Sequence, residues 1–182
     1  MIGFVCLSAV FVISIVIGDR EVDEAAFRNS FVDELRKQVG KTYVWGGEGF
    51  AGVDCSGLPR RAFRIACWKR GFLDLNPGLW RLAIQNWAFD ASASAMKEEY
   101  RGETRNLGVE AASISTLNSN KVAPGDLAVT ENGIHMLAYL GENRWIQADP
   151  GRGLVIIEDA RTSENHWLNT PVEFLSWSIL AK

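Results

Sequence analysis

Along residues 22–39, hydrophobic positions recur with the three-to-four-residue spacing of an α-helix. The stripe consists of Ala26, Phe27, Phe31, Leu35 and Val39. Such a stripe places its members on one helix face and leaves the charged residues on the opposite face. The pattern predicts an amphipathic helix over 22–39, with Gly40 as its stop.

A second helical stripe follows a segment rich in glycine. Its hydrophobic positions are Leu58, Ala62, Ile65 and Ala66. We expect a helix over 55–70 that ends at Gly71. Pro59 is compatible with this start, because the first turn of a helix has no intrahelical partner for its N–H groups. The basic residues of this helix are expected to form a solvated face: Arg60, Arg61, Arg64, Lys69 and Arg70.

After Pro124 the hydrophobic pattern changes to alternation, which is typical of strands. Strands are predicted over 127–129, 134–140, 144–148 and 154–157, with further extended pieces over 171–175 and 178–180. Glu131-Asn132-Gly133 is a strong hairpin signal between the first two strands. Helices followed by antiparallel strands predict an α+β fold with N-terminal helices packed on a central antiparallel β-sheet.

Residues 72–122 are less regular and rich in tryptophan. A segment around Trp80, Ile84 and Trp87 has helical spacing, but the region shows neither an internal repeat nor a linker composition. We interpret 72–122 as an insertion within a single domain that spans residues 19–182. The sequence leaves open whether its tryptophans form a lid or part of the core.

The composition is that of a folded protein, because 47% of its 182 residues are hydrophobic and 23% are charged. The net charge of -3, without a basic stripe, gives no electrostatic reason to bind nucleic acid. Nucleic-acid binding is therefore not expected.

Residues 1–18 carry no charged side chain and are almost wholly apolar. The run is shorter than the ~20 residues of a membrane span and is typical of a signal-peptide core. Val16 and Gly18 would stand at the small-residue positions of a cut before Asp19. The expected location is secreted or periplasmic. The alternative is an uncleaved anchor, with membrane association, or a buried element of the domain.

Cys55 and Cys67 remain after removal of residues 1–18. Twelve positions in one helix separate them by about 18 Å, whereas a disulfide needs Cα atoms within about 7 Å. Two cysteines and two histidines without close spacing also argue against a zinc site, so no metal or cofactor is expected. Cys67 is expected to be a small buried hydrophobe.

The motif Asp54-Cys55-Ser56-Gly57 places a cysteine at the start of the second helix. The positive end of the helix dipole favours a thiolate there, and backbone N–H groups at the helix start can stabilise an oxyanion. His135, expected in the middle of the 134–140 strand, can accept and return the proton. We expect the helix to pack on the His135 face of the sheet and bring Cys55 to the imidazole.

Strand alternation predicts the partner of that histidine. His135 and Gln147 fall on one face of neighbouring strands, with Asp149 close by. Either side chain could orient the imidazole through its second nitrogen. A lone cysteine, or a histidine in a strand, is more often structural, but the combination favours a cysteine peptidase or amidase. His166 lacks such a context and is expected to be structural.

Several ordered motifs resemble those of the NlpC-type cell-wall peptidases, a branch of the papain-like cysteine peptidases. They are Tyr43-Val44-Trp45-Gly46-Gly47, Asp54-Cys55-Ser56-Gly57-Leu58, Pro124-Gly125-Asp126-Leu127, the run 133–141 around His135, and Trp145-Ile146-Gln147-Ala148. The resemblance covers about residues 25 to 160.

The resemblance implies that Cys55 is the nucleophile, His135 the base and Gln147 the third polar residue, where the family often has histidine. Asp149 is the reserve for that third role. Tyr43, Asp54 and Ser56 match positions near the nucleophile that help to hold the substrate. Pro59 departs from the family, which usually has an aliphatic residue there, and the stretch before Pro124 is longer than usual.

The family implies hydrolysis of the amide between γ-D-glutamate and diaminopimelate or lysine in a peptidoglycan stem peptide. The same chemistry on a non-wall amide or thioester, as an amidase or acyltransferase, is an alternative. Another is a catalytically silent wall-binding domain. The sequence chooses neither the diamino acid nor the oligomeric state.

Overall fold

The computed structural model of the chain describes residues 20–117 and 119–181. The predicted signal peptide of residues 1–18 lies outside the described residues. None of the helices in the described ranges is long and apolar enough to cross a membrane.

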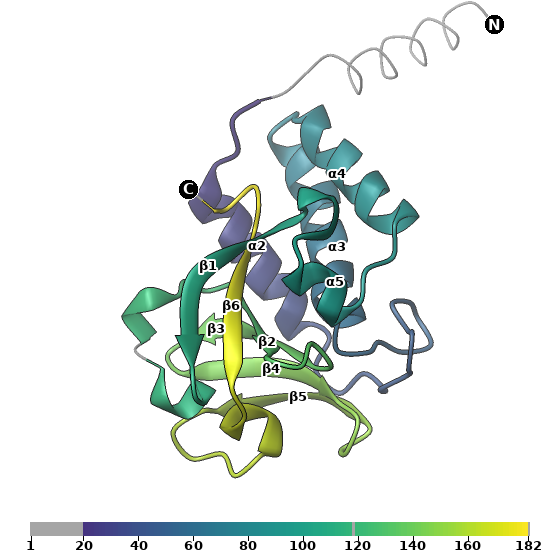
Figure 1. Cartoon of the computed structure of the whole chain (residues 1–182). Helices are drawn as coiled ribbons and strands as arrows, with labels where there is room; N and C mark the ends of the chain where they lie inside the picture. The colour runs from purple at the N-terminus through teal and green to yellow at the C-terminus, as the bar shows by residue number, and fades with distance from the viewer. Residues whose placement is uncertain (1–19, 118, 182) are drawn as a thin grey trace, which may run out of the picture.

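A six-stranded antiparallel sheet carries the fold (Figure 1). Its strands are β1 (Thr104–Ala111), β2 (Leu127–Thr130), β3 (Met136–Gly141), β4 (Arg144–Asp149), β5 (Leu154–Asp159) and β6 (Val172–Trp177). Their spatial order is β1-β6-β2-β3-β4-β5. Together with the helices, this sheet confirms the predicted α+β fold.

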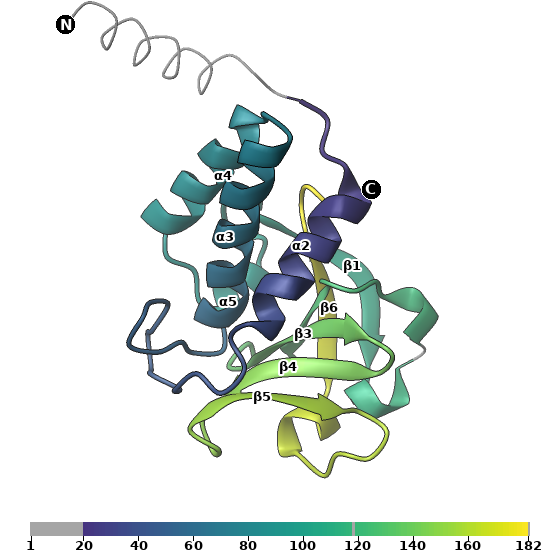
Figure 2. The same cartoon turned by 180° about the vertical axis from the view of Figure 1, so that it is seen from behind.

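Four α-helices lie before the sheet strands or lead into them. They are α2 (Glu24–Arg36), α3 (Gly57–Leu73), α4 (Pro77–Ala88) and α5 (Ala93–Lys97). Figures 1 and 2 show α2 and α3 side by side over the sheet, with α4 outside α3. Four short 3-10 helices complete the described elements: η1 (Tyr100–Gly102), η2 (Ile114–Thr116), η3 (Ser119–Lys121) and η4 (His166–Asn169).

Both faces of the sheet are covered, but by different parts of the chain. On the helix side of the sheet, the apolar faces of α2 and α3 pack with Met136, Ala138 and Leu140 of β3. On the other side, Leu137 and Tyr139 pack against residues of η2 and η4. The helices therefore lie on the face opposite to the one that carries the odd-numbered residues of β3.

Aromatic packing holds the helices to the sheet. Trp177 at the end of β6 is fully buried and stacks on Phe63 of α3, with ring centroids 3.9 Å apart. Phe31 of α2 meets the edge of the same indole at 6.0 Å. One side chain of the last strand thus contacts both core helices.

The predicted helices have small errors at their ends. The 22–39 prediction corresponds to α2, but this helix already ends at Arg36; turns follow it as far as Gly40, which takes a left-handed φ of 79°. The 55–70 prediction corresponds to α3, but Gly71 does not stop this helix, which continues to Leu73. Gly71 is buried against the indole of Trp80, where an added Cβ would lie 2.3 Å from Nε1, so close helix packing accounts for this glycine.

The region 72–122 is more regular than expected. It contains α4, α5 and the edge strand β1, which pairs with β6. In β1 the hydrophobic positions Leu107, Val109 and Ala111 alternate and are partly buried, while Gly108 takes a φ of 65° and the register shifts between Asn106 and Glu110. This alternation covers only three positions around a glycine, and the strand was not predicted from it. The two pieces predicted over 171–175 and 178–180 are a strand, β6, and a turn after it.

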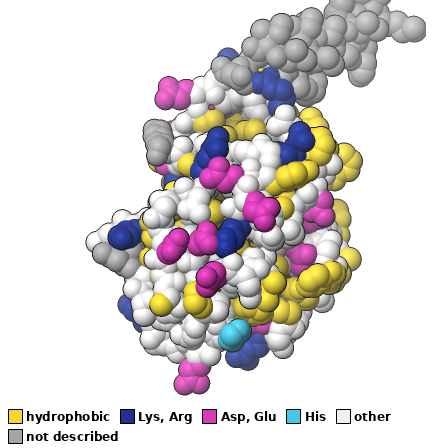
Figure 3. All heavy atoms as spheres, viewed as in Figure 1, with side chains coloured by type: hydrophobic (Ala, Val, Ile, Leu, Met, Phe, Trp, Pro, Cys, Tyr) yellow, Lys and Arg dark blue, Asp and Glu magenta, His cyan; other side chains and the backbone are white. Residues whose placement is uncertain are grey.

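Several large hydrophobic side chains remain exposed on the side of α4 and of the glycine-rich loop (residues 44–52). Trp87 of α4 is 71% exposed, and Trp45 and Phe50 of the loop are 85% and 94% exposed. Figure 3 shows hydrophobic side chains gathered along this edge, while acidic and basic side chains are intermixed over the rest of the face.

Candidate active site

Asp54 holds the start of α3 and the glycine-rich loop together. Its Oδ1 accepts hydrogen bonds from Gly57 N at 2.6 Å and from Ser56 Oγ at 3.1 Å. Its Oδ2 accepts from Gly46 N at 2.9 Å. Asp54 thus caps a helix N–H that would otherwise lack a partner. Ser56, the residue just before the helix, makes no side-chain capping bond.

Cys55 lies two residues before the first residue of α3 and is 8% exposed. Its Sγ donates to the carbonyl oxygen of Ile134 at 3.8 Å. The backbone N–H groups of Met136, Ser56 and Cys55 lower the pKa of the thiol. Cys55 is therefore close to the backbone on either side of His135.

His135 comes directly before β3, so its predicted position in the middle of a strand is wrong. The reason is a tight turn: Thr130 Oγ1 accepts from His135 N at 3.0 Å, and Thr130 N donates to His135 O at 3.0 Å. Gly133 supplies the left-handed φ of 71° that this turn requires. The imidazole is held just before the first residue of β3, and His135 is only 2% exposed.

Gln147 of β4 is the residue that contacts the imidazole. Its Oε1 lies 2.6 Å from His135 Nε2, and both side chains are buried. An amide oxygen only accepts, so Nε2 carries the proton and Nδ1 is free to accept one. The predicted neighbourhood of His135 and Gln147 is confirmed, whereas Asp149 makes its contacts elsewhere.

The expected packing of the helix on the His135 face is wrong. His135 and Gln147 share their face with Leu137, Tyr139 and Trp145, whereas α3 packs on the opposite face. Cys55 nevertheless comes close to His135, because both precede the first regular residue of their element and lie at one end of the sheet. Figure 1 shows the start of α3 above that end of β3 and β4.

Burial sets the protonation of the two candidate reacting groups. Burial, and then the negative charge of Asp54, raises the pKa of Cys55 to about 11, although backbone N–H groups lower it. Burial lowers the pKa of His135 to about 4, although the bond to Gln147 and the charge of Asp149 raise it. The expected low pKa of the thiol is wrong for this state of the protein, which holds a thiol beside a neutral imidazole at pH 7.

Trp167 in η4 covers the imidazole, a contact that the sequence did not indicate. Its ring stacks on His135 with centroids 4.1 Å apart and planes 22° from parallel. The backbone N of Trp167 donates to Oδ1 of Asn165, which begins η4. The only sequence signal for this contact was Asn165-His166-Trp167, in which an N-cap residue stands two positions before a tryptophan. His166 is exposed, and its ring is tilted against that of Trp167.

Two of the three residues predicted to hold substrate line a cavity whose lining does not include Cys55. Asp54 and Ser56 contribute to this cavity of about 190 Å³ together with Asp90 and Ser92 from the region 72–122. Tyr43 is not part of that lining; burial, and then the charges of Cys55 and Asp54, raise the pKa of Tyr43. A larger hollow of about 840 Å³ lies behind Trp167 and is lined by Asp149, Glu158 and Asn165 among others.

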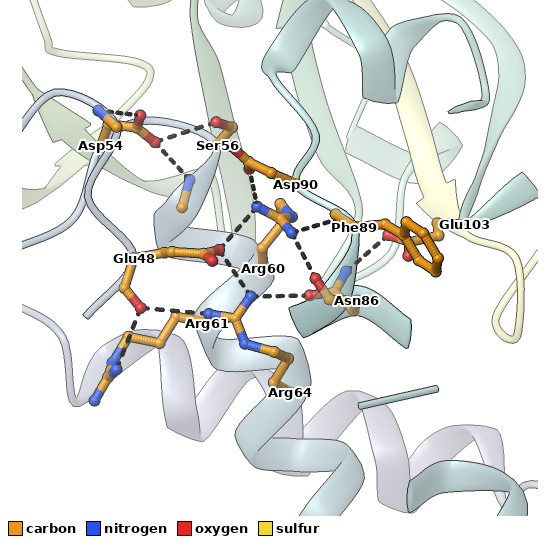
Figure 4. A network of polar contacts seen from close by, with 12 residues as sticks. Glu48, Asp54, Ser56, Arg60, Arg61, Arg64, Asn86, Phe89, Asp90 and Glu103 are labelled. Carbon is orange, nitrogen blue, oxygen red and sulfur yellow. Dashed lines mark hydrogen bonds and ion pairs between the residues drawn. The ribbon is translucent and has the colours of Figure 1, made fainter. Parts of the chain in front are cut away.

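A buried arginine network ties the floor of the smaller cavity together (Figure 4). Arg60 is 1% exposed and pairs with Glu48 at 2.8 Å and with Asp90. Arg64 pairs with the same Glu48 oxygen at 2.8 Å and reaches Asn86 of α4 at 3.1 Å. The expected solvated face is therefore wrong for Arg60 and Arg64, which join the glycine-rich loop to α3 and α4.

Cys55 and Cys67 are both free and buried, and burial raises the pKa of Cys67 well above its ordinary value. Within residues 20–117 and 119–181, no group of three or more His, Cys, Asp or Glu could hold a metal ion. Cys67 lies within the hydrophobic core, as expected.

Comparison with solved structures identifies the fold. NlpC2 from Trichomonas vaginalis matches with a TM-score of 0.53 and 18% identity, over 87% of this chain and 49% of that chain. NlpC1 from the same organism matches with a TM-score of 0.50 and 17% identity, over 81% and 42%. The P60 domain of an antigen from Mycobacterium avium subspecies paratuberculosis matches with a TM-score of 0.52 and 18% identity, over 87% and 98%.

These matches confirm the NlpC-type fold that the sequence motifs indicate. The chain spans less than half of the length of the two Trichomonas proteins, but nearly all of the P60 domain. Neither a family model nor a curated protein matches the sequence.

Proposed function

We propose that this protein is an exported cysteine peptidase that hydrolyses an amide bond in peptidoglycan stem peptides. The bond is the one between γ-D-glutamate and diaminopimelate or lysine, and residues 1–18 act as the export signal. The main support is a pair of contacts. Cys55 Sγ hydrogen-bonds to the carbonyl oxygen of Ile134, next to His135. Gln147 Oε1 lies 2.6 Å from His135 Nε2.

In the first step Cys55 Sγ attacks the amide carbonyl carbon while His135 Nδ1 accepts the thiol proton. Neither group is charged beforehand at pH 7, because the pKa of Cys55 is about 11 and that of His135 about 4. Proton transfer therefore accompanies the attack. Backbone N–H groups beside the sulfur, among them that of Cys55, are available to the oxyanion.

In the second step the tetrahedral intermediate expels the amine of the diamino acid, which takes the proton from His135. The product is a thioester between Cys55 and the γ-carboxyl of D-glutamate. Water then attacks this thioester with His135 as general base, which releases the carboxylate and restores the thiol. Neither a metal nor a cofactor takes part in these steps.

The cavity beside Ser56 suits the amine-terminal part of a short peptide. It holds about 190 Å³ and carries the carboxylates of Glu48, Asp54 and Asp90. Arg60 pairs with Glu48 and Asp90, and Arg64 pairs with Glu48, so three carboxylates face two guanidinium groups. This excess of negative charge supports recognition of a protonated amine. The small volume favours a peptide that ends close to the scissile bond over an internal segment of a long chain.

The test uses residues 19–182 beside the Cys55→Ala variant. Both are incubated with purified peptidoglycan and with a defined stem tetrapeptide, and the products are read by mass spectrometry. We expect a cut after γ-D-glutamate with Cys55 intact and none with Cys55→Ala.

Two other outcomes would favour an alternative function. A cysteine that reacts with a thiol probe while both substrates stay whole would point to an amidase or acyltransferase on another substrate. Binding to peptidoglycan without any cut, with Cys55 unreactive until the protein is denatured, would indicate the silent wall-binding domain.

A further inference from the structure

The polar groups behind His135 form a directed chain of hydrogen bonds. Gln147 accepts at Oε1 from His135 Nε2 at 2.6 Å, and its Nε2 donates to Glu158 Oε2 at 2.7 Å. A carboxylate only accepts hydrogen bonds, so Glu158 binds the NH₂ end of the amide. The amide oxygen is thereby directed to His135.

This direction matters because the two ends of a glutamine amide are alike in shape and opposite in function. If the amide were reversed, its NH₂ group would face His135 Nε2, which would then have to be the unprotonated nitrogen. The proton would lie on Nδ1, and Nδ1 could no longer accept a proton from Cys55. Gln147 alone therefore does not select the productive tautomer.

Glu158 is itself held in place from the segment after β5. Ser163 Oγ donates to its Oε1 at 2.9 Å, and Asn165 Nδ2 donates to its Oε2 at 2.9 Å. Asn165 also donates to Asp149 Oδ2 at 2.7 Å, and its Oδ1 accepts from the backbone of Trp167. The residues that fix the carboxylate thus also place the indole that covers the imidazole.

We propose that Glu158 is the positioning residue that fixes the amide orientation of Gln147 and, through it, the Nε2–H tautomer of His135. The inference rests on the proposed function for its consequence in catalysis and deepens it. Glu158 touches neither Cys55 nor His135 and acts only through Gln147.

The direct readout is the tautomer of His135 in the protein without substrate. The sequence contains only two histidines, His135 and His166, so one His166→Gln variant assigns the imidazole signals. In ¹⁵N-labelled protein at pH 7, long-range ¹H–¹⁵N spectra separate the Nε2–H form, the Nδ1–H form and the imidazolium.

We expect the Nε2–H form in the unmodified protein and a substantial share of Nδ1–H in Glu158→Leu. The same variant should lose at least about tenfold in kcat on the stem peptide, since a wrong tautomer can cost up to ~10⁴. Glu158→Asp, which keeps an acceptor, should retain most of the Nε2–H form. The matched control is Glu164→Leu, which removes an exposed carboxylate from the same hollow and should change neither readout.

If Glu158→Leu does not fold, Glu158→Gln serves in its place, since it keeps the shape while its amide can also donate to a reversed Gln147. An unchanged Nε2–H tautomer in a folded variant would overturn the inference. The spectra need no substrate. If the tautomer shifts in Glu158→Leu but the unmodified protein cleaves no stem peptide, the inference on Glu158 is supported and only the proposed function is contradicted.

Discussion

For single residues, burial shifts the pKa away from the value that the neighbouring residues in the sequence would suggest. Cys55 stands beside the positive end of α3, which favours a thiolate, yet it is 8% exposed and lies next to Asp54. Desolvation and the negative charge outweigh the helix end and raise the pKa of Cys55 to about 11. The free protein thus holds a neutral thiol and a neutral imidazole at pH 7, and the proposed reaction has to form the thiolate as it proceeds.

This state predicts how Cys55 responds to pH in the absence of substrate. The alkylation rate by iodoacetamide should rise about tenfold per pH unit between pH 7 and 9.5, because the thiolate fraction grows in that proportion below a pKa of about 11. The rate is followed by mass spectrometry of the Cys55 peptide. Cys55→Ala reports any labelling of Cys67, and a plateau below pH 8 would show a preformed thiolate instead.

His135 links folding stability to pH in a defined direction. Its pKa is lowered from 6.5 to about 4 in the folded protein, so folding favours the neutral imidazole. The stability is fully present above pH 6.5 and is lost as the pH falls through 6.5 towards 4. At ~1.4 kcal/mol per unit, the loss amounts to about 3 kcal/mol.

Urea unfolding at pH 7.5 and pH 4.0 measures this contribution. The carboxylates of the protein add their own acid dependence, so the comparison is with His135→Asn. The unmodified protein should lose about 3 kcal/mol more than the variant between the two pH values. Equal losses in the two proteins would show that the imidazole is not buried as described.

At the scale of elements, a buried ionic cluster joins three segments that the sequence separates. Glu48 of the glycine-rich loop accepts from Arg60 and Arg64 of α3, and Asn86 of α4 binds Arg64 and Glu103. Burial of Arg60 and Arg64 needs these partners, because an unpaired buried charge is strongly destabilising. The cluster thereby fixes the loop that lines the cavity beside Asp54 and Ser56.

Glu48→Gln should lower the free energy of unfolding by about 2 to 4 kcal/mol, because it leaves two buried guanidinium groups without their shared carboxylate. Urea denaturation gives the value. The control is Glu142→Gln, which breaks the exposed pair with Arg144 and should cost less than about 1 kcal/mol. A similar cost for both variants would mean that the cluster contributes no more than a surface ion pair.

The elements that the sequence indicated best are those with strong local patterns. α2, α3, β2, β4 and β5 follow from helical or alternating hydrophobic positions, and their errors lie at the ends. β1 was missed because its alternation is limited to Leu107, Val109 and Ala111, runs through Gly108 and includes a register shift. Its existence depends on β6, which lies more than sixty residues later.

For the whole molecule, the contact between helices and sheet depends on a few large side chains. Trp177 is fully buried between β6, Phe63 of α3 and Phe31 of α2. The N-terminal helix is also tied to the C-terminal strand by polar contacts, since Arg28 bonds to Asp126 at 2.9 Å and Ser176 bonds to the same carboxylate. Figure 2 shows α2 lying across the sheet.

Trp177→Ala should therefore destabilise the protein by about 3 to 5 kcal/mol, through the lost transfer energy and the cavity that remains. Thermal and urea unfolding measure the change. Trp87→Ala is the matched control, because Trp87 is 71% exposed and its loss should change stability by less than about 0.5 kcal/mol. A cost below 1 kcal/mol for Trp177→Ala would show that the two layers are held together by other contacts.

The sequence by itself determined the fold class, the helix and strands beside which Cys55, His135 and Gln147 lie, and the pairing of His135 with Gln147. These follow from local periodicity, turn signals and strand alternation, which act over a few residues. Only the tertiary structure decided that α3 packs on the face away from His135, that Trp167 and Glu158 stand behind the imidazole, and that Arg60 is buried. It also decided the pKa of Cys55, because desolvation depends on every segment that surrounds the sulfur and not on the residues beside it in the chain.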